Sequence, residues 1–208
     1  MKREFIAYIT REESCVDDLF KGESGLYPDP NHILKTYCSR IHKYKLREKL
    51  EEDDSKKQLI PYTVLRNRDG EIFVTERLEG SGEERLHNQL SIGVGGHLDI
   101  SMTSINKDPI RAGAYAELNE ELCISGLTPS IRYVGILSDD NNDVGRVHLG
   151  FVYAGQVFAG SVEVKETEKL RGFWEQPQNI DRERLESWSK ILLDNLSTVF
   201  PDYPYCGA

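Results

Sequence analysis

GVGGHLD at residues 93–99 and AELNEELCISG at residues 116–126 are the two stretches of this sequence that decide its fold. The first is a glycine-rich break after an apolar run, and the second carries three glutamates on a helical pattern. Between them, Asp108 is a good N-cap residue and Pro109 suits the first position of a helix. Apolar residues then recur every four positions, which predicts a helix with one buried stripe that ends near Ser125: Ile110, Ala114, Leu118 and Leu122.

The three glutamates of this helix, Glu117, Glu120 and Glu121, stand at positions i, i+3 and i+4. At about 100° per residue they fall within an arc of roughly 100°, so they can converge on one point. Such like-charged pairs cost an isolated helix about 0.2–0.5 kcal/mol each, and no Lys or Arg occupies an i±3 or i±4 position to offset this. Two interpretations remain: a solvated acidic face, or a site for a cation that prefers oxygen ligands, such as Mg²⁺ or Mn²⁺.

Outward from this helix, alternating apolar residues predict strands on both sides. LIPYTVLRN (59–67) and EIFVTERL (71–78) read as a hairpin around an Asp-Gly turn, and 86–96 approach as a strand that breaks at the glycines. Residues 97–108 read as an irregular loop. Beyond the helix we expect strands over 130–139, 146–155 and 162–175, and an amphipathic closing helix over 182–196.

Residues 1–56 have a different pattern from the rest. FIAYIT (5–10) predicts a strand, and apolar spacing predicts a helix from Ile33 to Leu50. The simplest architecture is a mixed α/β domain over residues 57–208, with residues 1–56 as an N-terminal extension that packs on it.

Composition excludes several classes of protein. Among 208 residues, 35 are acidic and 26 are basic, and the net charge of −9 opposes binding to polymeric nucleic acid. No apolar run approaches the roughly 20 residues of a membrane-spanning helix, and the N-terminus has no secretory signal pattern. Four cysteines stand far apart, which favours a reducing, cytoplasmic location.

These motifs together carry a resemblance to a known family. GVGGHLD followed by AELNEELCISG resembles the Nudix box, GX5EX7REUXEEXGU, of the Nudix hydrolases, and a MutT-like subgroup described as predicted phosphoesterases. Glu117, Glu120 and Glu121 match its three closing glutamates, and Asp108 falls where its first glutamate belongs. Three features depart from the box: a loop insertion between Gly96 and Asp108, Ala116 in place of the arginine, and Cys123 in place of the glycine.

The resemblance implies a Nudix-like α/β/α sandwich over about residues 58–200 and a function. The expected activity is Mg²⁺- or Mn²⁺-dependent hydrolysis of a nucleoside diphosphate linked to a moiety X, by attack of water on phosphorus. Glu117, Glu120 and Glu121 would hold the metal. Catalytic roles are expected for Glu120 and Glu121, with Glu166 or Glu168 as other candidates for the general base.

Substrate contacts are expected at the glycine-rich turn, where exposed backbone N–H groups can approach an anion, and at two side chains. The candidates are Gly95, Gly96, His97 and Arg77. The sequence does not satisfy GxGxxG, so a dinucleotide-binding fingerprint is rejected.

One alternative function stays open. A Nudix-like binding module for a nucleotide or a protein would keep the fold without hydrolysis, and Ala116 and Cys123 favour it. Under the hydrolase interpretation the partner is a small nucleoside diphosphate derivative, and the sequence also leaves a homodimer open.

Overall fold

The computed structural model describes residues 4–29, 31–39, 43–78, 88–100, 107–158 and 160–202. The chain divides into two compact units, each built from three segments. The first unit contains residues 1–62, 95–116 and 133–152, and the second contains residues 63–94, 117–132 and 153–208. Each unit is therefore described by itself.

The first unit is built around the N-terminal strand. Strand β1 (Phe5–Thr10) pairs antiparallel with β3 (Tyr44–Leu46) on one side and with β4 (Lys56–Arg66) on the other. In the same unit β2 (Gly25–Pro28) pairs antiparallel with the end of β9 (Ser130–Ser138).

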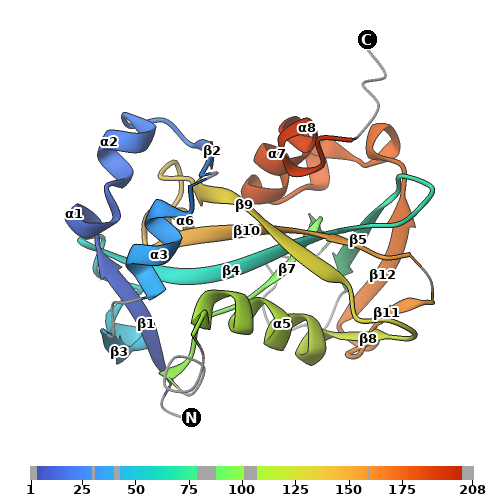
Figure 1. Cartoon of the computed structure of the whole chain (residues 1–208), viewed down its shortest axis with the longest axis horizontal. Helices are drawn as coiled ribbons and strands as arrows, with labels where there is room; N and C mark the ends of the chain where they lie inside the picture. Colours follow the sequence, from blue (N-terminus) through green and yellow to red (C-terminus); the bar gives the residue numbers. More distant parts are fainter. Residues whose placement is uncertain are drawn as a thin grey trace. The chain divides into compact units, whose positions relative to one another are not determined.

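Short helices accompany these strands. In Figure 1, α1 (Arg11–Ser14), α2 (Val16–Phe20) and α3 (Ile33–Ser39) lie beside β1 and β2. Two further short elements are the 3₁₀ helix η1 (Arg47–Lys49) and α6 (Asp143–Arg146). Residues 1–56 thus contribute strands to the sheet as well as surface helices, and the division of the chain at residue 57 stays a prediction.

The second unit carries its own strand pairs. Strand β5 (Ile72–Arg77) pairs antiparallel with β12 (Leu170–Glu175) and with β6 (Leu90–Ser91). A separate pair joins β8 (Leu122–Ile124) to β11 (Val162–Val164). The remaining elements of this unit are η3 (Pro177–Asn179), η4 (Arg182–Arg184), α7 (Ser187–Asp194) and α8 (Leu196–Val199).

The main sheet confirms the predicted mixed α/β class. Its strands follow the order β12-β5-β4-β10-β9-β2, and β7 (Gly93–Gly95) also pairs with β4. Strands β4, β9 and β10 (His148–Gln156) contain residues of both units. The predicted hairpin is present as β4 and β5, with Arg66 opposite Ile72.

Helix α5 (Pro109–Glu121) begins where the sequence predicted. The carboxylate of Asp108 accepts the backbone N–H of Arg111 at 3.0 Å, and the Asp108 carbonyl accepts that of Ala112. The predicted apolar stripe is buried throughout, at 0–2% exposure: Ile110, Ala114, Leu118 and Leu122. Burial of this stripe orients the opposite, acidic face of the helix.

Pairing between distant segments makes four element boundaries of the sequence analysis wrong. The predicted helix over 33–50 stops at Ser39, because residues 44–46 pair with β1 as strand β3. Helix α5 ends at Glu121, because β8 follows at once and pairs with β11. The predicted strand over 162–175 is two strands, β11 and β12. The closing α-helix covers only Ser187–Asp194 of the predicted 182–196.

The glycine-rich break also differs from its prediction. Gly93 and Gly95 lie inside β7, so the chain leaves the strand only after Gly95. A Cβ at Gly95 would lie 2.3 Å from the carbonyl oxygen of Pro61. Close packing against β4 therefore requires glycine at this position. Residues 101–106 of the predicted loop lie outside the described residues.

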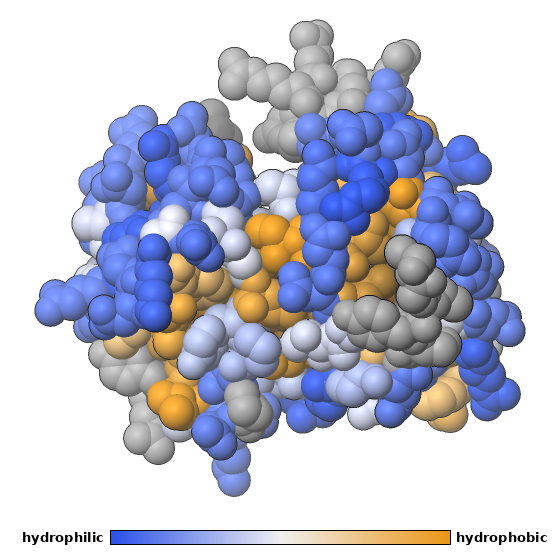
Figure 2. Space-filling view, turned by 90° about the horizontal axis from the view of Figure 1, so that it is seen from above, coloured by the Kyte–Doolittle hydropathy of each residue, from blue (hydrophilic) through white to orange (hydrophobic). Residues whose placement is uncertain are grey.

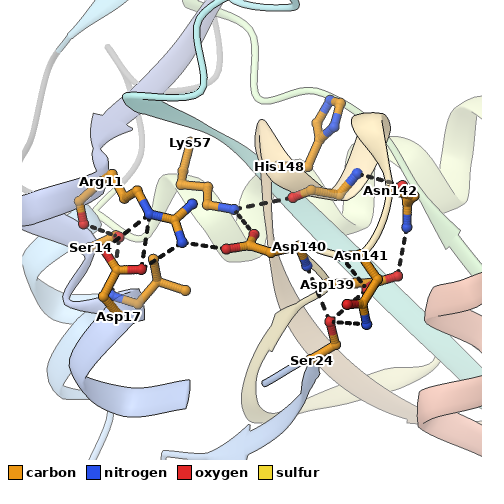
Figure 3. A network of polar contacts seen from close by, with 12 residues as sticks. Arg11, Ser14, Asp17, Ser24, Lys57, Asp139, Asp140, Asn141, Asn142 and His148 are labelled. Atoms are coloured by element: carbon orange, nitrogen blue, oxygen red, sulfur yellow. Dashed lines mark hydrogen bonds and ion pairs between the residues drawn. The ribbon is translucent and has the colours of Figure 1, made fainter. Parts of the chain in front are cut away.

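A buried polar network joins the N-terminal segment to the turn before α6 within the first unit (Figure 3). The Lys57 ammonium is completely buried; it lies 2.6 Å from the Asp140 carboxylate and donates to the Gly145 carbonyl at 3.1 Å. The Arg11 guanidinium donates to Asp17 and to Asp140. Burial lowers the pKa of Lys57 despite its hydrogen bond to Asp140. Removing either partner would leave a buried charge uncompensated.

The same turn is fixed by neutral groups. The Ser24 hydroxyl donates to Asp139 at 2.6 Å, and the Asn142 side chain accepts the backbone N–H of Gly145 at 2.8 Å (Figure 3). On the face drawn in Figure 2, hydrophilic residues, in blue, cover much of the surface, and hydrophobic residues, in orange, are also exposed. Among the described residues, no helix is long and apolar enough to span a membrane.

Candidate functional site

The predicted carboxylates occupy the last turn and a half of α5, within the second unit. The buried Leu118 lies between Glu117 and Glu120 in the sequence and faces the core. Glu117 and Glu121 are half-buried and Glu120 is exposed. The helix therefore presents two partly desolvated carboxylates and one solvated carboxylate on the same face.

Burial and mutual repulsion raise the pKa values of two of these groups. The pKa of Glu117 rises to about 7, mainly through burial and then through repulsion by Glu120. The pKa of Glu121 also rises to about 7, first through burial and then through repulsion by Glu117. Arg77 lowers the Glu121 pKa, while Glu120 and Glu186 raise it further. The cluster is short of positive charge.

The C-terminal end of α5 is anchored by the segment after β11. The backbone N–H of Lys165 donates to the Glu121 carbonyl at 2.8 Å, and the Lys165 ammonium donates to the Asn119 carbonyl. This cation satisfies one of the carbonyls that a helix end leaves free. The contact also brings the residues that follow Lys165 in the chain, which include Glu166 and Glu168, toward the helix turn that carries the carboxylates.

The two late candidates for a general base are both exposed. The Glu166 carboxylate pairs with Lys169 at 2.9 Å. The backbone carbonyl of Glu166 accepts the N–H groups of Lys169 and Leu170 at a tight turn. Glu168 lies in the same turn between β11 and β12. An exposed carboxylate is free to rotate toward a bound substrate, so the assignment of Glu168 stays a prediction.

Arg77 and Glu186 are the charged residues of the second unit that act on Glu121 from other elements. Arg77 ends β5, its side chain is exposed, and its backbone N–H donates to the Gln89 carbonyl at 3.2 Å. Its charge lowers the pKa of Glu121, and its role as a substrate contact stays a prediction.

Glu186 was missed by the sequence analysis. It is the N-cap residue of α7, and its carboxylate accepts the hydroxyls of Ser91 at 2.7 Å and Ser189 at 3.2 Å. The Ser189 hydroxyl in turn accepts the backbone N–H of Ile92. The predicted helix over 182–196 included Glu186, so its position before the first residue of α7 is seen only in the structure.

The predicted substrate contacts Gly95, Gly96 and His97 belong to the first unit. Gly95 and Gly96 are half-buried. The His97 ring faces His148, with the two Nε2 atoms 3.1 Å apart. The other ring nitrogen of His148, Nδ1, lies 2.6 Å from the Val144 carbonyl oxygen.

The donor set of α5 fits a hard divalent cation by its chemistry. Carboxylate oxygens are the ligands that Mg²⁺ and Mn²⁺ prefer, and the raised pKa values show that negative charge here lacks compensation. Within the described part of the chain, no three or more His, Cys, Asp or Glu side chains are already arranged to hold a metal. A cation would therefore have to draw the carboxylates together.

Comparison with known structures defines the class of this protein. Tm1382, a candidate Nudix hydrolase of known crystal structure, matches 96% of this chain and 100% of its own with a TM-score of 0.76 and 24% identity. The Nudix domain of Shewanella oneidensis NrtR, solved in complex with ADP ribose, matches 67% of this chain and 87% of its own with a TM-score of 0.50 and 12% identity. This chain has the Nudix hydrolase fold, as the sequence predicted.

A closer relative is found among characterised sequences. Protein YmaB of Bacillus subtilis (strain 168) is 38% identical over 193 residues, which span 86% of this chain and 93% of YmaB. The chain belongs to the YmaB family. No protein-family model matches the chain.

Proposed function

We propose that this protein is a divalent-metal-dependent hydrolase that cleaves a nucleoside diphosphate linked to a moiety X by attack of water on phosphorus. The observation that carries the proposal is the pair of half-buried carboxylates of Glu117 and Glu121, whose pKa values burial and repulsion raise to about 7. Folding has placed like charges together at a desolvation cost, and a divalent cation offsets both.

The three glutamates have distinct roles in this proposal. Glu117 and Glu121 hold the cation from the partly desolvated side of α5, and Glu120 holds it from the solvent side. A bound Mg²⁺ or Mn²⁺ would neutralise diphosphate oxygens and lower the pKa of a coordinated water. Glu120, Glu121 and Glu168 are the candidates for accepting the proton of the attacking water.

Arg77 is the proposed contact for a substrate phosphate. Its planar guanidinium suits a bidentate contact with phosphate oxygens, and it lies at the exposed end of β5. In the first unit we propose Gly95, Gly96 and His97 as further substrate contacts. The expected partner is a small nucleoside diphosphate derivative, and the proposed location is the cytoplasm. A nucleic acid polymer is disfavoured as a partner because the net charge is −9.

A binding module for a nucleotide or a protein is the second candidate function. Ala116 removes the arginine that braces the loop of the Nudix box, and Cys123 replaces its glycine. Cys123 is exposed on β8, so the substitution is accommodated as a strand residue. Under this function the fold and the acidic face would remain but no bond would be cleaved.

A substrate panel separates the two functions. The full chain is incubated with Mg²⁺ or Mn²⁺ and with dNTPs, nucleotide sugars, ADP-ribose, NADH and diadenosine polyphosphates, and released phosphate or nucleoside monophosphate is measured. We expect metal-dependent release from at least one class. Glu120→Gln and Glu121→Gln should each lower that rate by about a hundredfold or more.

Glu163→Gln is the matched control. Glu163 is an exposed glutamate of β11, the strand that pairs with β8 directly after the candidate turn. The substitution removes the same charge without touching α5, so full activity is expected. Equal release by wild type and by both α5 variants would refute the hydrolase proposal, and nucleotide binding without release would favour the binding module.

A further inference from the structure

His97 and His148 form a close pair inside the first unit, apart from the carboxylates of α5. Their Nε2 atoms lie 3.1 Å apart, and the ring centroids are 5.2 Å apart with planes inclined by 58°. Both residues are half-buried. The distance between the two nitrogens is therefore that of a hydrogen bond, and it is also close to the distance between two nitrogens that bind the same metal ion.

The proton positions on His148 follow from its second nitrogen. Nδ1 lies 2.6 Å from the Val144 carbonyl oxygen, which can only accept, so Nδ1 carries the proton. In the neutral ring, Nε2 then presents a lone pair to His97. The carbonyl belongs to α6, whose start is capped by Asn142, so the His148 ring is held against that turn. A carbonyl that orients an imidazole in this way is typical of metal-ligating histidines.

The surroundings keep both rings neutral, which is the form that binds metals. Burial lowers the pKa of His97 to about 3, with Arg47 and His148 adding to the effect. Burial also lowers the pKa of His148; Arg47 and Lys57 act in the same direction, against the Val144 carbonyl and Glu51.

The strand whose backbone bonds to both histidine segments carries a buried unpaired polar side chain. Gln58 is completely buried, and neither atom of its side-chain amide has a hydrogen-bond partner among the described residues. Its backbone N–H donates to the carbonyl of Val147, the residue before His148. The next carbonyl of the strand, that of Leu59, accepts the N–H of Leu98, the residue after His97. A buried unpaired amide costs about 1–3 kcal/mol, so the structure tolerates an open polar position between the two histidine segments.

We propose that His97 and His148 form a binding site for one late first-row transition-metal ion, such as Zn²⁺, through their Nε2 atoms. Two nitrogens bound to one tetrahedral zinc at about 2.0–2.1 Å lie about 3.3 Å from each other, close to the observed separation. Imidazole ligands select zinc and its neighbours over Mg²⁺. The bound ion displaces the proton shared by the two Nε2 atoms, and His97 stays neutral by carrying its proton on Nδ1.

Solvent would complete the coordination. No third His, Cys, Asp or Glu joins the pair among the residues that the structure describes. The site shares His97 with the proposed substrate contacts, but none of the α5 carboxylates takes part, so Zn²⁺ binding can be measured apart from hydrolysis. The bound ion would tie the residues after β7 to the start of β10.

Imidazole nitrogen NMR on the full chain tests this proposal. The exposed thiols Cys15 and Cys123 are first replaced by serine, because thiolates compete for zinc. With one equivalent of Zn²⁺, we expect the Nε2 resonances of His97 and His148 to shift together. His32, whose ring packs against Tyr133, should not shift and serves as the internal reference. If neither of the paired resonances moves in excess Zn²⁺, or only one moves, the proposal is overturned.

Calorimetry on variants gives a second readout. His97→Gln and His148→Gln should each weaken Zn²⁺ binding by at least about tenfold, whereas His32→Asn should not. Asparagine suits the control because residue 32 has a positive φ of 53°. Unchanged affinity in both Gln variants would contradict the site. If a Gln variant does not fold, the wild-type spectrum decides alone.

Discussion

Glu121 illustrates how a single residue acquires its properties from distant parts of the chain. Its helix neighbours supply the negative charges of Glu117 and Glu120, and burial against the core removes water. Arg77, which ends β5, lowers its pKa. The carboxylate pair thus stores an electrostatic penalty that protonation or a cation relieves.

The metal-free protein should lose stability as pH rises through the neutral range. The folded pKa of Glu117 and Glu121, about 7, lies above the ordinary value of 4.5. Between about 4.5 and 7 the folded state therefore binds more protons than the unfolded state, and the free energy of unfolding falls with increasing pH. Urea unfolding in EDTA at a series of pH values measures this slope, and Mg²⁺ should restore more stability at pH 8 than at pH 5.

Two variants identify the source of this pH dependence. Glu121→Gln should flatten the profile, because it removes one of the two groups whose pKa is raised to about 7. Glu163→Gln should leave the profile unchanged. A wild-type profile as flat as that of Glu121→Gln would show that these carboxylates do not titrate as the structure indicates.

Gly95→Ala should destabilise the protein through a clash rather than through lost chemistry. The added Cβ would lie 2.3 Å from the Pro61 carbonyl oxygen, and relieving such overpacking costs about 1–3 kcal/mol. Gly25→Ala is the matched control, because its Cβ meets nothing within 4 Å. Chemical unfolding compares the two. Equal effects would indicate that backbone flexibility, not packing, decides at both positions.

At the scale of the element, α5 is defined locally at its start and by tertiary contacts at its end. Asp108 caps the first turn by accepting from Arg111, and it also pairs with Lys35 at 2.7 Å. The last turn gives way to β8, which pairs with β11. Both the start and the end of α5 therefore determine where the carboxylates of its final turn lie.

Asp108→Ala should cost about 0.5–2 kcal/mol of stability through loss of the N-cap. Asp108→Asn keeps a capping side chain but loses the ion pair with Lys35, in which the two side chains are 36% and 13% exposed and which is worth about 1 kcal/mol. Urea unfolding of both variants separates the two contributions. Should the Asn variant be as unstable as the Ala variant, the ion pair and not the cap would carry the effect.

At the scale of the whole molecule, residues 1–56 are part of the first unit's sheet. Strand β1 pairs with β4 through three consecutive residue pairs, from Tyr8 and Gln58 to Thr10 and Lys56. Arg11 joins the buried pair of Lys57 and Asp140. Removing the segment would expose β4 along one edge and take away a cation from a buried carboxylate.

A chain of residues 57–208 should therefore fail to unfold cooperatively or should aggregate. Circular dichroism and size-exclusion chromatography check this directly. Ile9→Ala is the milder companion variant, because Ile9 is completely buried in β1 and a cavity there costs about 2–5 kcal/mol. Native-like stability of the shortened chain would show that residues 1–56 are a dispensable addition.

Local physics alone determined much of this protein. The start of α5, its buried stripe, the β4–β5 hairpin, the strand over FIAYIT and the clustering of three glutamates on one face follow from periodicity and capping, which act within a few residues. The match to the Nudix box followed from the same short segments. These features could be predicted from the sequence because the residues that interact in each of them lie close together in the chain.

Only the tertiary structure decided the features whose partners lie far away. Residues 44–46 form β3 because they pair with the edge of β1. Helix α5 stops at Glu121 because the next residues form β8 and pair with β11. Arg77 and Glu186 reach Glu121, and His97 meets His148, through folding that no spacing along the chain encodes. The intrinsic preference of a residue for helix or strand is worth only about a few tenths of a kcal/mol. Backbone hydrogen bonds between segments and the burial of their side chains outweigh that preference.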